Sequence, residues 1–318
     1  MPKVSVIVPV YNAENYIEDC CENLLNQSYE DYEVIFVNDG STDNSQKKLE
    51  NLASKCDKIQ IITQENQGQA MARNAGIKQS KGDFLCFVDI DDGISKEMLE
   101  KMMEAQKESD ADLVWCNAYI KKNGEILGTL DETYPNVDDS QKNYVLHNAS
   151  PWRKCIRRFL LENHNLYFPK LRFYEDLAVV PSYGLYTNKI YYLNEPLYTY
   201  VLHEGSTMHQ KSYHQKLEDI FKSIDILSNF IEHSFYKDNI KDELEYLYID
   251  HLLHAASLRF FEFENTEIQL DKIVEIMKLK YPLWKKNKYF KQKDWKYKLI
   301  CYLFYKKKRN LLGYILKR

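Results

Sequence analysis

The 318-residue sequence lacks the features that mark secreted, zinc-binding and membrane-spanning proteins. Its seven cysteines are an odd number and no two of them form a C-x-x-C pair, which predicts free thiols in a reducing cytosol and no zinc site. No apolar run approaches the roughly 18–20 residues that a helix needs to cross a bilayer. No basic segment with an apolar stretch and a cleavage site precedes the first predicted strand, so we expect no signal peptide and a cytoplasmic location.

Charge is unevenly distributed, although the formal net charge is only −4. Residues 285–318 contain 13 basic residues and one acidic residue, a balance of +12, whereas residues 1–284 contain 30 basic and 46 acidic residues, a balance of −16. This asymmetry indicates an anionic partner for the basic end. Nucleic acid is disfavoured as that partner, because the remainder is acidic and no nucleic-acid-binding motif is present.

The basic segment also has an apolar pattern. Trp295, Leu299, Tyr302 and Leu303 follow the spacing of one helical face, with lysines on both sides. Basic residues interleaved with aromatic ones favour an anionic membrane surface as the partner of residues 285–318. The alternative is a solvated helix that packs on the rest of the protein.

Strands and helices alternate over the first 90 residues. Near-continuous apolar runs at Glu33–Val37 and Asp83–Val88 predict strands covered on both faces, and helical patterns lie between the strands. The alternation predicts an α/β fold with a mostly parallel, doubly wound sheet flanked by helices. Ligands of such sheets bind at the carboxyl ends of the strands. Polar groups follow three of these predicted ends: Tyr11-Asn12, Asn38-Asp39-Gly40 and Asp89-Ile90-Asp91-Asp92.

Later segments carry weaker signals. Asn123-Gly124 predicts a hairpin turn. Residues 131–150 are polar and are expected to form a loop, whereas residues 216–235 and 241–263 are expected to form long amphipathic helices. The C-terminal region is therefore predicted to be helical.

Three carboxylates, Asp89, Asp91 and Asp92, occupy four consecutive positions after a buried strand. They repel one another unless a divalent cation binds, and oxygen ligands suit Mg²⁺ or Mn²⁺. An acidic loop that caps the next helix is the alternative. An EF-hand starting at Asp89 is excluded, because Ile94 stands at the turn position that requires glycine. A haloacid-dehalogenase-type phosphatase fits poorly, because Asp92 stands where that motif has glycine.

Two groups of motifs carry a resemblance. The first group is VSVIVPVYNAENYIEDCCENLLNQSYEDYEVIFVNDGSTDNS with ENQGQAMARNAGIKQSKGDFLCFVDIDD; the second is Pro151-Trp152-Arg153-Lys154, Tyr174-Glu175-Asp176, Tyr200 and His203-Glu204-Gly205-Ser206. The first group, over about 95 residues, resembles family 2 of the glycosyltransferases, which have the GT-A fold. The second resembles the acceptor half of bacterial members that build surface polysaccharides, so the resemblance reaches about residue 210.

The resemblance implies a nucleotide-sugar pocket. Asp39 would accept a hydrogen bond from the uracil ring, and Arg73 would contact the diphosphate. Asp89 would face the ribose or the metal, Asp91 would ligate the metal, and His203 would touch the metal or the diphosphate. The residues implied to bind the nucleotide sugar are Pro9, Val10, Tyr11, Asn12, Glu14, Asp39, Arg73, Asn74, Asp89, Ile90 and Asp91. One departure is Val201, where the family commonly has an arginine that contacts phosphate.

The resemblance also implies an acceptor side. Asp176 would be the catalytic general base that takes the proton of the acceptor hydroxyl as C1 is attacked, and Glu175 would orient or assist it. The alternative is that both residues only cap the helix that follows. Trp152 and Lys154 are expected on the acceptor side, where Trp152 would stack on a sugar; a buried core tryptophan is the alternative.

The implied function is an inverting glycosyltransferase of the hexosyltransferase type. It would use a UDP-sugar and Mn²⁺ or Mg²⁺, and would add a sugar to a saccharide or lipid-linked glycan at the inner face of the bacterial plasma membrane. We expect a catalytic domain over residues 1–210 (nucleotide half 1–95, acceptor half 96–210), a helical region over 211–284 and a basic amphipathic tail over 285–318. A non-catalytic nucleotide-sugar-binding or scaffolding protein remains an alternative. A nucleotidyltransferase would need a glycine-rich basic loop after the first strand, which VPVYNAEN lacks.

Overall fold

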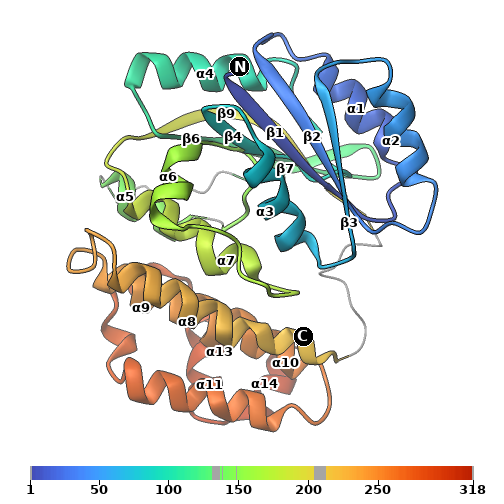
Figure 1. The fold of residues 1–318 in the computed structure, drawn as a ribbon. Helices are drawn as coiled ribbons and strands as arrows, with labels where there is room; N and C mark the ends of the chain where they lie inside the picture. Colours follow the sequence, from blue (N-terminus) through green and yellow to red (C-terminus); the bar gives the residue numbers. More distant parts are fainter. Residues whose placement is uncertain (1, 131–136, 138, 148, 204–212, 317–318) are drawn as a thin grey trace. The chain divides into compact units, whose positions relative to one another are not determined.

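The computed structural model describes residues 2–130, 137, 139–147, 149–203 and 213–316 (Figure 1). The chain forms two compact units, an α/β unit over Met1–His209 and a helical unit over Gln210–Arg318. The finer divisions expected at residues 95 and 284 stay predictions.

The described part of the α/β unit is built on a nine-stranded sheet with the order β3-β2-β1-β4-β8-β6-β9-β5, and β7 pairs with β6. β1 pairs in parallel with β2 and with β4, and β2 pairs in parallel with β3. β8 runs antiparallel between β4 and β6, so β1–β4, β6 and β9 share one direction and β5, β7 and β8 run opposite. The predicted mostly parallel sheet is confirmed. The strands are β1 (Val4–Val10), β2 (Tyr32–Asp39), β3 (Ile59–Gln64), β4 (Phe84–Phe87), β5 (Gly93–Ile94), β6 (Leu113–Lys122), β7 (Glu125–Thr129), β8 (Lys154–Arg157) and β9 (Ile190–Leu202).

Helices cover both faces of this sheet (Figure 1). Alternate residues of β1, among them Val6 and Val8, join one buried core with side chains of α1 (Ile17–Leu25), α2 (Ser45–Ala53) and α4 (Met98–Ser109). On the opposite face α3 (Gln69–Gln79) lies so close to β1 that a Cβ on Gly76 would come within 2.4 Å of Ile7 Cγ2. The absence of a side chain at this position therefore allows α3, which carries Arg73, to pack closely against the sheet.

The acceptor half holds three further α-helices among its described residues: α5 (Ser140–Leu146), α6 (Arg158–His164) and α7 (Glu175–Val179), followed by a 3-10 helix over Val180–Leu185. The turn at Asn123-Gly124 joins β6 and β7, as predicted, and both residues have positive φ. The prediction of a loop over residues 131–150 is wrong for Ser140–Leu146, which form α5. Asp139 caps α5 by accepting a hydrogen bond from Lys142 N, and the helix is too short for its period to be detected in the sequence.

The helical unit confirms the predicted helical C-terminal region. The helix expected over residues 241–263 is continuous, but its middle winds as a π-helix over Tyr248–Ala256. Among the described residues, no helix combines the length and apolar character that crossing a bilayer requires. The α-helices are α8 (Asp219–Glu232), α9 (Lys241–Leu247), α10 (Ser257–Phe261), α11 (Glu267–Lys280), α12 (Lys288–Gln292), α13 (Trp295–Tyr305) and α14 (Arg309–Leu316).

The basic segment is part of the core of the helical unit. α13 starts at Asp294, whose Oδ1 accepts a hydrogen bond from Tyr297 N, and it buries Ile300 and Phe304. The single apolar face predicted for this helix is divided: Leu303 is buried, whereas the Trp295 side chain is 73% exposed. Within the described part of this segment, α13 therefore supplies core side chains as well as an exposed aromatic face.

Candidate active site

The candidate active site centres on the buried guanidinium of Arg73. Arg73 Nη1 donates to Asp176 Oδ1 at 2.7 Å and lies 3.4 Å from Glu175 Oε1, and Nη2 donates to Asp89 Oδ1 at 3.0 Å. Gln69 Nε2 donates to the same oxygen of Asp89 at 3.0 Å. The structure therefore brings together the end of β4, the start of α7 and one face of α3.

The charges in this cluster are unbalanced, because three carboxylates surround one guanidinium. Burial raises the pKa of Asp176 to about 8; Arg73 opposes this shift, and Glu175 and Asp89 add to it. Burial also raises the pKa of Asp89, against the opposing effect of Arg73. A carboxyl group whose pKa lies near neutrality is suited to accept a proton during catalysis.

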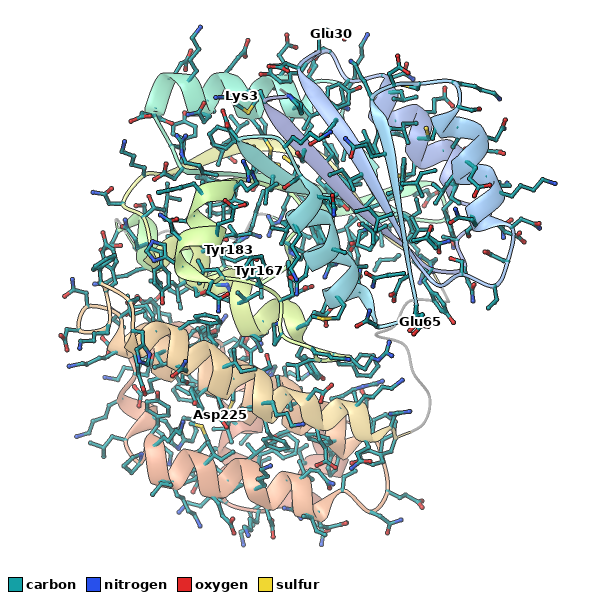
Figure 2. All side chains as sticks on the ribbon, in the orientation of Figure 1. Lys3, Glu30, Glu65, Tyr167, Tyr183 and Asp225 are labelled. Carbon is teal, nitrogen blue, oxygen red and sulfur yellow. The ribbon has the colours of Figure 1, made fainter. Side chains whose placement is uncertain are left out.

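Asp39 lies at the end of β2 and is 3% exposed. Its Oδ1 accepts hydrogen bonds from Gln64 Nε2 at 2.7 Å and Gln67 N at 2.8 Å, and its Oδ2 accepts one from Gly68 N at 2.7 Å. The carboxylate thus fixes the loop between β3 and α3, in which Figure 2 labels Glu65. Of the two oxygens, Oδ2 has the smaller number of protein donors.

The loop after β1 is tied to the loop after β2. Asn12 has a positive φ of 47°, and its Oδ1 accepts from Thr42 N at 2.8 Å. Glu14 Oε2 accepts from Asn44 N at 2.9 Å. Pro9 and Val10 are buried within β1, so Tyr11, which is 52% exposed, is the residue of this group that presents a large open side chain.

The carboxylates of the acidic loop after β4 lie in two different environments. Asp91 Oδ2 lies 2.5 Å from His203 Nε2, and both side chains are about 30% exposed. Asp92 is buried, where its Oδ2 accepts from Tyr198 Oη at 2.7 Å and its Oδ1 from Val201 N at 2.8 Å. Burial raises the pKa of Asp92 to about 8, and Asp89 adds to this rise. Asp92 therefore joins the loop to β9. Ile90 packs against the core.

The side chains of Trp152 and Lys154 are buried and are not accessible to an acceptor. The Trp152 ring is 6% exposed and stacks on Tyr198 and Tyr200, with centroid distances of 4.7 Å and 5.4 Å. Lys154 is 1% exposed and donates from Nζ to Ser150 O. The expectation of an exposed sugar platform is corrected to the core alternative, because aromatic packing encloses the indole. Residues 204–206 of the second motif group lie outside the described residues.

A model of the family described as "Glycosyl transferase family 2" matches residues 5–174, which include every carboxylate of the β4 loop. The chain belongs to glycosyl transferase family 2. The resemblance inferred from the motifs is confirmed.

Several family 2 relatives are similar to the chain. EpsH of Bacillus subtilis is 34% identical over 68% of this chain and 65% of its own length. The Staphylococcus aureus poly(ribitol-phosphate) beta-N-acetylglucosaminyltransferase TarS is 29% identical over 84% of this chain and 45% of its own length. The chain thus spans less than two thirds of either relative.

Solved structures give the same fold. The crystal structure of S. aureus TarS 1–349 in complex with UDP-GlcNAc has a TM-score of 0.75 and 26% identity, and the match covers 89% of this chain and 83% of that one. The mannosyltransferase PcManGT from Pyrobaculum calidifontis, in complex with GDP-Man and Mn²⁺, has a TM-score of 0.59 and 16% identity. The second likeness supports the fold alone.

Three further residues contact residues of this candidate site but had no local sequence signal. Gln69 contacts Asp89, and Tyr198 contacts Asp92 and also accepts a hydrogen bond from Asp89 N at 3.1 Å. Arg172 Nη1 donates to Asn66 Oδ1 at 3.0 Å, beside the loop that Asp39 holds. Arg172 therefore places a positive charge beside the loop between β3 and α3.

A cavity of about 710 Å³ borders the acidic loop. Asp91 and Asp92 line one side, and Tyr16, Tyr119 and Thr199 line others. Its volume falls within the roughly 300–1,000 Å³ typical of small-molecule sites. The cavity lies beside the acidic loop, and its lining includes none of Asp39, Arg73 and Asp176.

Among the described residues, no three His, Cys, Asp or Glu side chains converge into a ready metal cage. Asp91 and His203 nevertheless present an oxygen and a nitrogen donor together, and both are partly exposed. A divalent ion held by one or two protein carboxylates commonly completes its shell with substrate phosphates. The donor set fits such an ion, which Asp91 and His203 would hold, while Asp89 Oδ1 is bonded to Arg73.

Proposed function

We propose that this family 2 protein is an inverting glycosyltransferase that transfers a sugar from a UDP-sugar to a glycan. The observation that carries the proposal is the convergence of Asp89, Glu175 and Asp176 on Arg73. Asp39 holds the loop between β3 and α3, which leads into the helix that carries Arg73. The TarS complex with UDP-GlcNAc, a structural neighbour at 26% identity, supports a UDP-sugar as the donor.

In this proposal Asp176 is the general base. The acceptor hydroxyl oxygen forms a bond to C1 of the donor sugar, the bond from C1 to the diphosphate oxygen breaks, and the hydroxyl proton passes to Asp176 Oδ. UDP leaves with the electrons of the broken bond. A single displacement of this kind inverts C1, so an α-linked donor gives a β-linked product. Glu175 shares Nη1 of Arg73 with Asp176 and helps to orient it.

Asp91, His203 and Asp89 are the residues that would hold a divalent cation such as Mn²⁺ or Mg²⁺. When bound, the cation offsets negative charge on the diphosphate. Asp92 keeps the loop in position through its bonds to Tyr198 and Val201.

The donor assignment is tested with a panel of UDP-, GDP- and TDP-sugars, beginning with UDP-GlcNAc. We expect UDP and one UDP-sugar to raise the melting temperature in the presence of Mn²⁺, and that UDP-sugar alone to be turned over. The measurements are thermal stabilisation and release of free nucleotide. Stabilisation and turnover by GDP-sugars, with no effect of UDP, would replace the donor class in the proposal.

The acceptor in this proposal is a growing bacterial surface glycan, attached to lipid at the inner face of the plasma membrane. TarS is named for a poly(ribitol-phosphate) acceptor, which supports an anionic or polymeric acceptor as the first to assay. An exposed basic and aromatic face of the helical unit supports the membrane location. This face, called here the α13 face, consists of Lys285, Trp295, Tyr302 and Lys306.

Charge and exposure on the α13 face match an anionic bilayer. Trp295 is 73% exposed and Tyr302 is 40% exposed, and positions 295, 302 and 306 follow one side of the helix. Lys285 Nζ lies 4.3 Å from the centroid of the Tyr302 ring, which brings a cation from outside the helix to the same surface. Each lysine near an anionic surface contributes about 1 kcal/mol to binding.

We expect Lys285→Glu with Lys306→Glu to weaken binding to phosphatidylglycerol vesicles by at least about tenfold, since two favourable charges are reversed. The measurement is co-sedimentation, with phosphatidylcholine vesicles for comparison. Lys222→Glu with Lys237→Glu, at two other exposed lysines of the helical unit, is the charge-matched control. Point variants are preferable to deletion of residues 285–318, because deletion would remove Ile300 and Phe304 from the core. Unchanged binding, or equal binding to neutral vesicles, would contradict the membrane location.

A further inference from the structure

Arg73 and Asn74 are neighbours on α3. Both side chains contact the segment 168–176, which ends at the proposed base, Asp176. We infer that this pair is a positioning clamp for Asp176, and that it acts on the acceptor side instead of binding the nucleotide sugar directly. The inference rests on the proposed role of Asp176 as general base. It assigns to Arg73 and Asn74 a task that differs from the nucleotide-sugar binding implied by the motifs.

Asn74 holds the backbone of the segment. Its Nδ2 donates to Phe168 O at 2.8 Å, and its Oδ1 accepts from Phe168 N at 3.0 Å. A side-chain amide that pairs with both polar groups of one residue fixes that residue as a neighbouring strand would. Both polar atoms of the Asn74 amide are thereby engaged with residue 168, which lies 94 positions further along the chain.

Arg73 holds the side chains at the other end of the segment. Its guanidinium contacts Asp176 and Glu175 through Nη1 and Asp89 through Nη2, and its Cζ lies 5.3 Å from the centroid of the Phe168 ring. The side chain is 1% exposed. Both Nη1 and Nη2 are thus engaged with carboxylates, which favours a positioning role for this guanidinium.

The segment needs such support because α7 is short. α7 spans five residues, Glu175–Val179, and has no side-chain hydrogen bond at its N-cap. The N-cap residue, Tyr174, has a left-handed φ of 60°, which a tyrosine adopts at a cost in free energy. A single turn of helix does not hold its own geometry in water, so the position of Asp176 depends on its external partners. In Figure 2 the labels Tyr167 and Tyr183 mark the stretches of chain before and after α7.

The clamp also connects the proposed acceptor side of the site with the proposed donor side. Asp89 belongs to the loop that carries Asp91, and the same guanidinium that fixes Asp176 fixes Asp89 at 3.0 Å. The distance between the base and the acidic loop is thereby set through one rigid, planar group. Displacement of a reacting group by about 1 Å can reduce a rate by roughly 10²-fold.

The experiment compares Asn74→Ala and Arg73→Lys with the wild type. Asn74→Ala removes both bonds to Phe168 without a change in charge, and Arg73→Lys keeps the charge but loses the planar fork. We expect kcat for transfer to fall about 10²-fold in each variant. The KM for the donor and the Kd for UDP should stay within about threefold of the wild type. Lys78→Gln, an exposed change on the same helix, is the control and should leave kcat unchanged.

Rates are expressed per molecule that binds UDP, so a variant that only unfolds loses binding sites and keeps its kcat. If one variant fails to fold, the other decides the question. A rise of tenfold or more in the UDP Kd with kcat retained would show that Arg73 or Asn74 contacts the nucleotide, and would overturn the clamp. Wild-type kcat in Asn74→Ala would overturn it as well.

Asp176→Asn, measured in parallel, separates this inference from the proposed function. Full transfer activity in Asp176→Asn removes the base assignment, and the clamp with it. Loss of transfer in Asp176→Asn, together with wild-type rates in both clamp variants, removes the clamp and leaves the base assignment in place.

Discussion

Asp176→Asn is expected to reduce the rate of sugar transfer by about 10²–10⁴-fold, the range that general-base help contributes. The substitution keeps the size of the side chain but removes the carboxylate that would accept the hydroxyl proton. Asp176 contacts Arg73 and is proposed to act on the acceptor side, so UDP affinity should change by less than about threefold. Steady-state transfer and calorimetric UDP binding are the two measurements.

The pH dependence provides a second readout of the same residue. Burial raises the pKa of Asp176 to about 8, and the charged groups that act on it are Arg73, Glu175, Asp89 and Lys154. A base works only when unprotonated, so kcat/KM should rise with pH below about 8 and level off above it. Asp57→Asn, an exposed change in the same unit, is the control. Full activity of Asp176→Asn, or a rate that falls as pH rises towards 8, would contradict the assignment.

Asp91→Ala is expected to lower donor turnover by about 10³-fold, which corresponds to about 4 kcal/mol of transition-state stabilisation. The reason is charge: Asp91 and His203 present the partly exposed donor atoms that suit a divalent cation. Chelation of the wild type with EDTA should produce a loss of similar size that Mn²⁺ or Mg²⁺ restores. Turnover and UDP binding are measured with and without the metal.

Asp31→Ala, at an exposed aspartate of the same unit, serves as the charge-matched control and should behave like the wild type. His203→Ala should cause a smaller loss, since it leaves the carboxylate in place. Turnover that persists in EDTA and in Asp91→Ala would remove the metal from the proposal, while the base assignment would still rest on Asp176→Asn.

Local patterns in the sequence were sufficient for the framework of the α/β unit. The runs that became β2 and β4 are nearly all apolar, because both faces of these strands are covered by helices. The carboxyl ends of parallel strands meet at one edge, so the polar residues after β1, β2 and β4 were expected to share a site. The motifs around them identified family 2, which the family match confirms.

Partners within the site were not predictable in the same way. Arg73 and Asp176 are 103 positions apart, and Tyr198 is 106 positions from Asp92. Such contacts depend on how α7 and β9 pack against the first half of the sheet, and no local period reports that packing. For the same reason, the sequence did not decide whether Trp152 is a sugar platform or a core residue, and the structure buries it in stacking contact with Tyr198 and Tyr200.

The sequence by itself determined the alternating strands and helices, the acidic loop, the family and the concentration of positive charge in residues 285–318. Each of these features depends only on composition or on the spacing of residues close together in the chain. Only the tertiary structure decided which charges meet. It brought Arg73 to Asp176 and Asn74 to Phe168, and it placed Leu303 in a core while Trp295 stayed exposed. The physical reason is that burial and ion pairing are properties of residues brought together from distant parts of the chain.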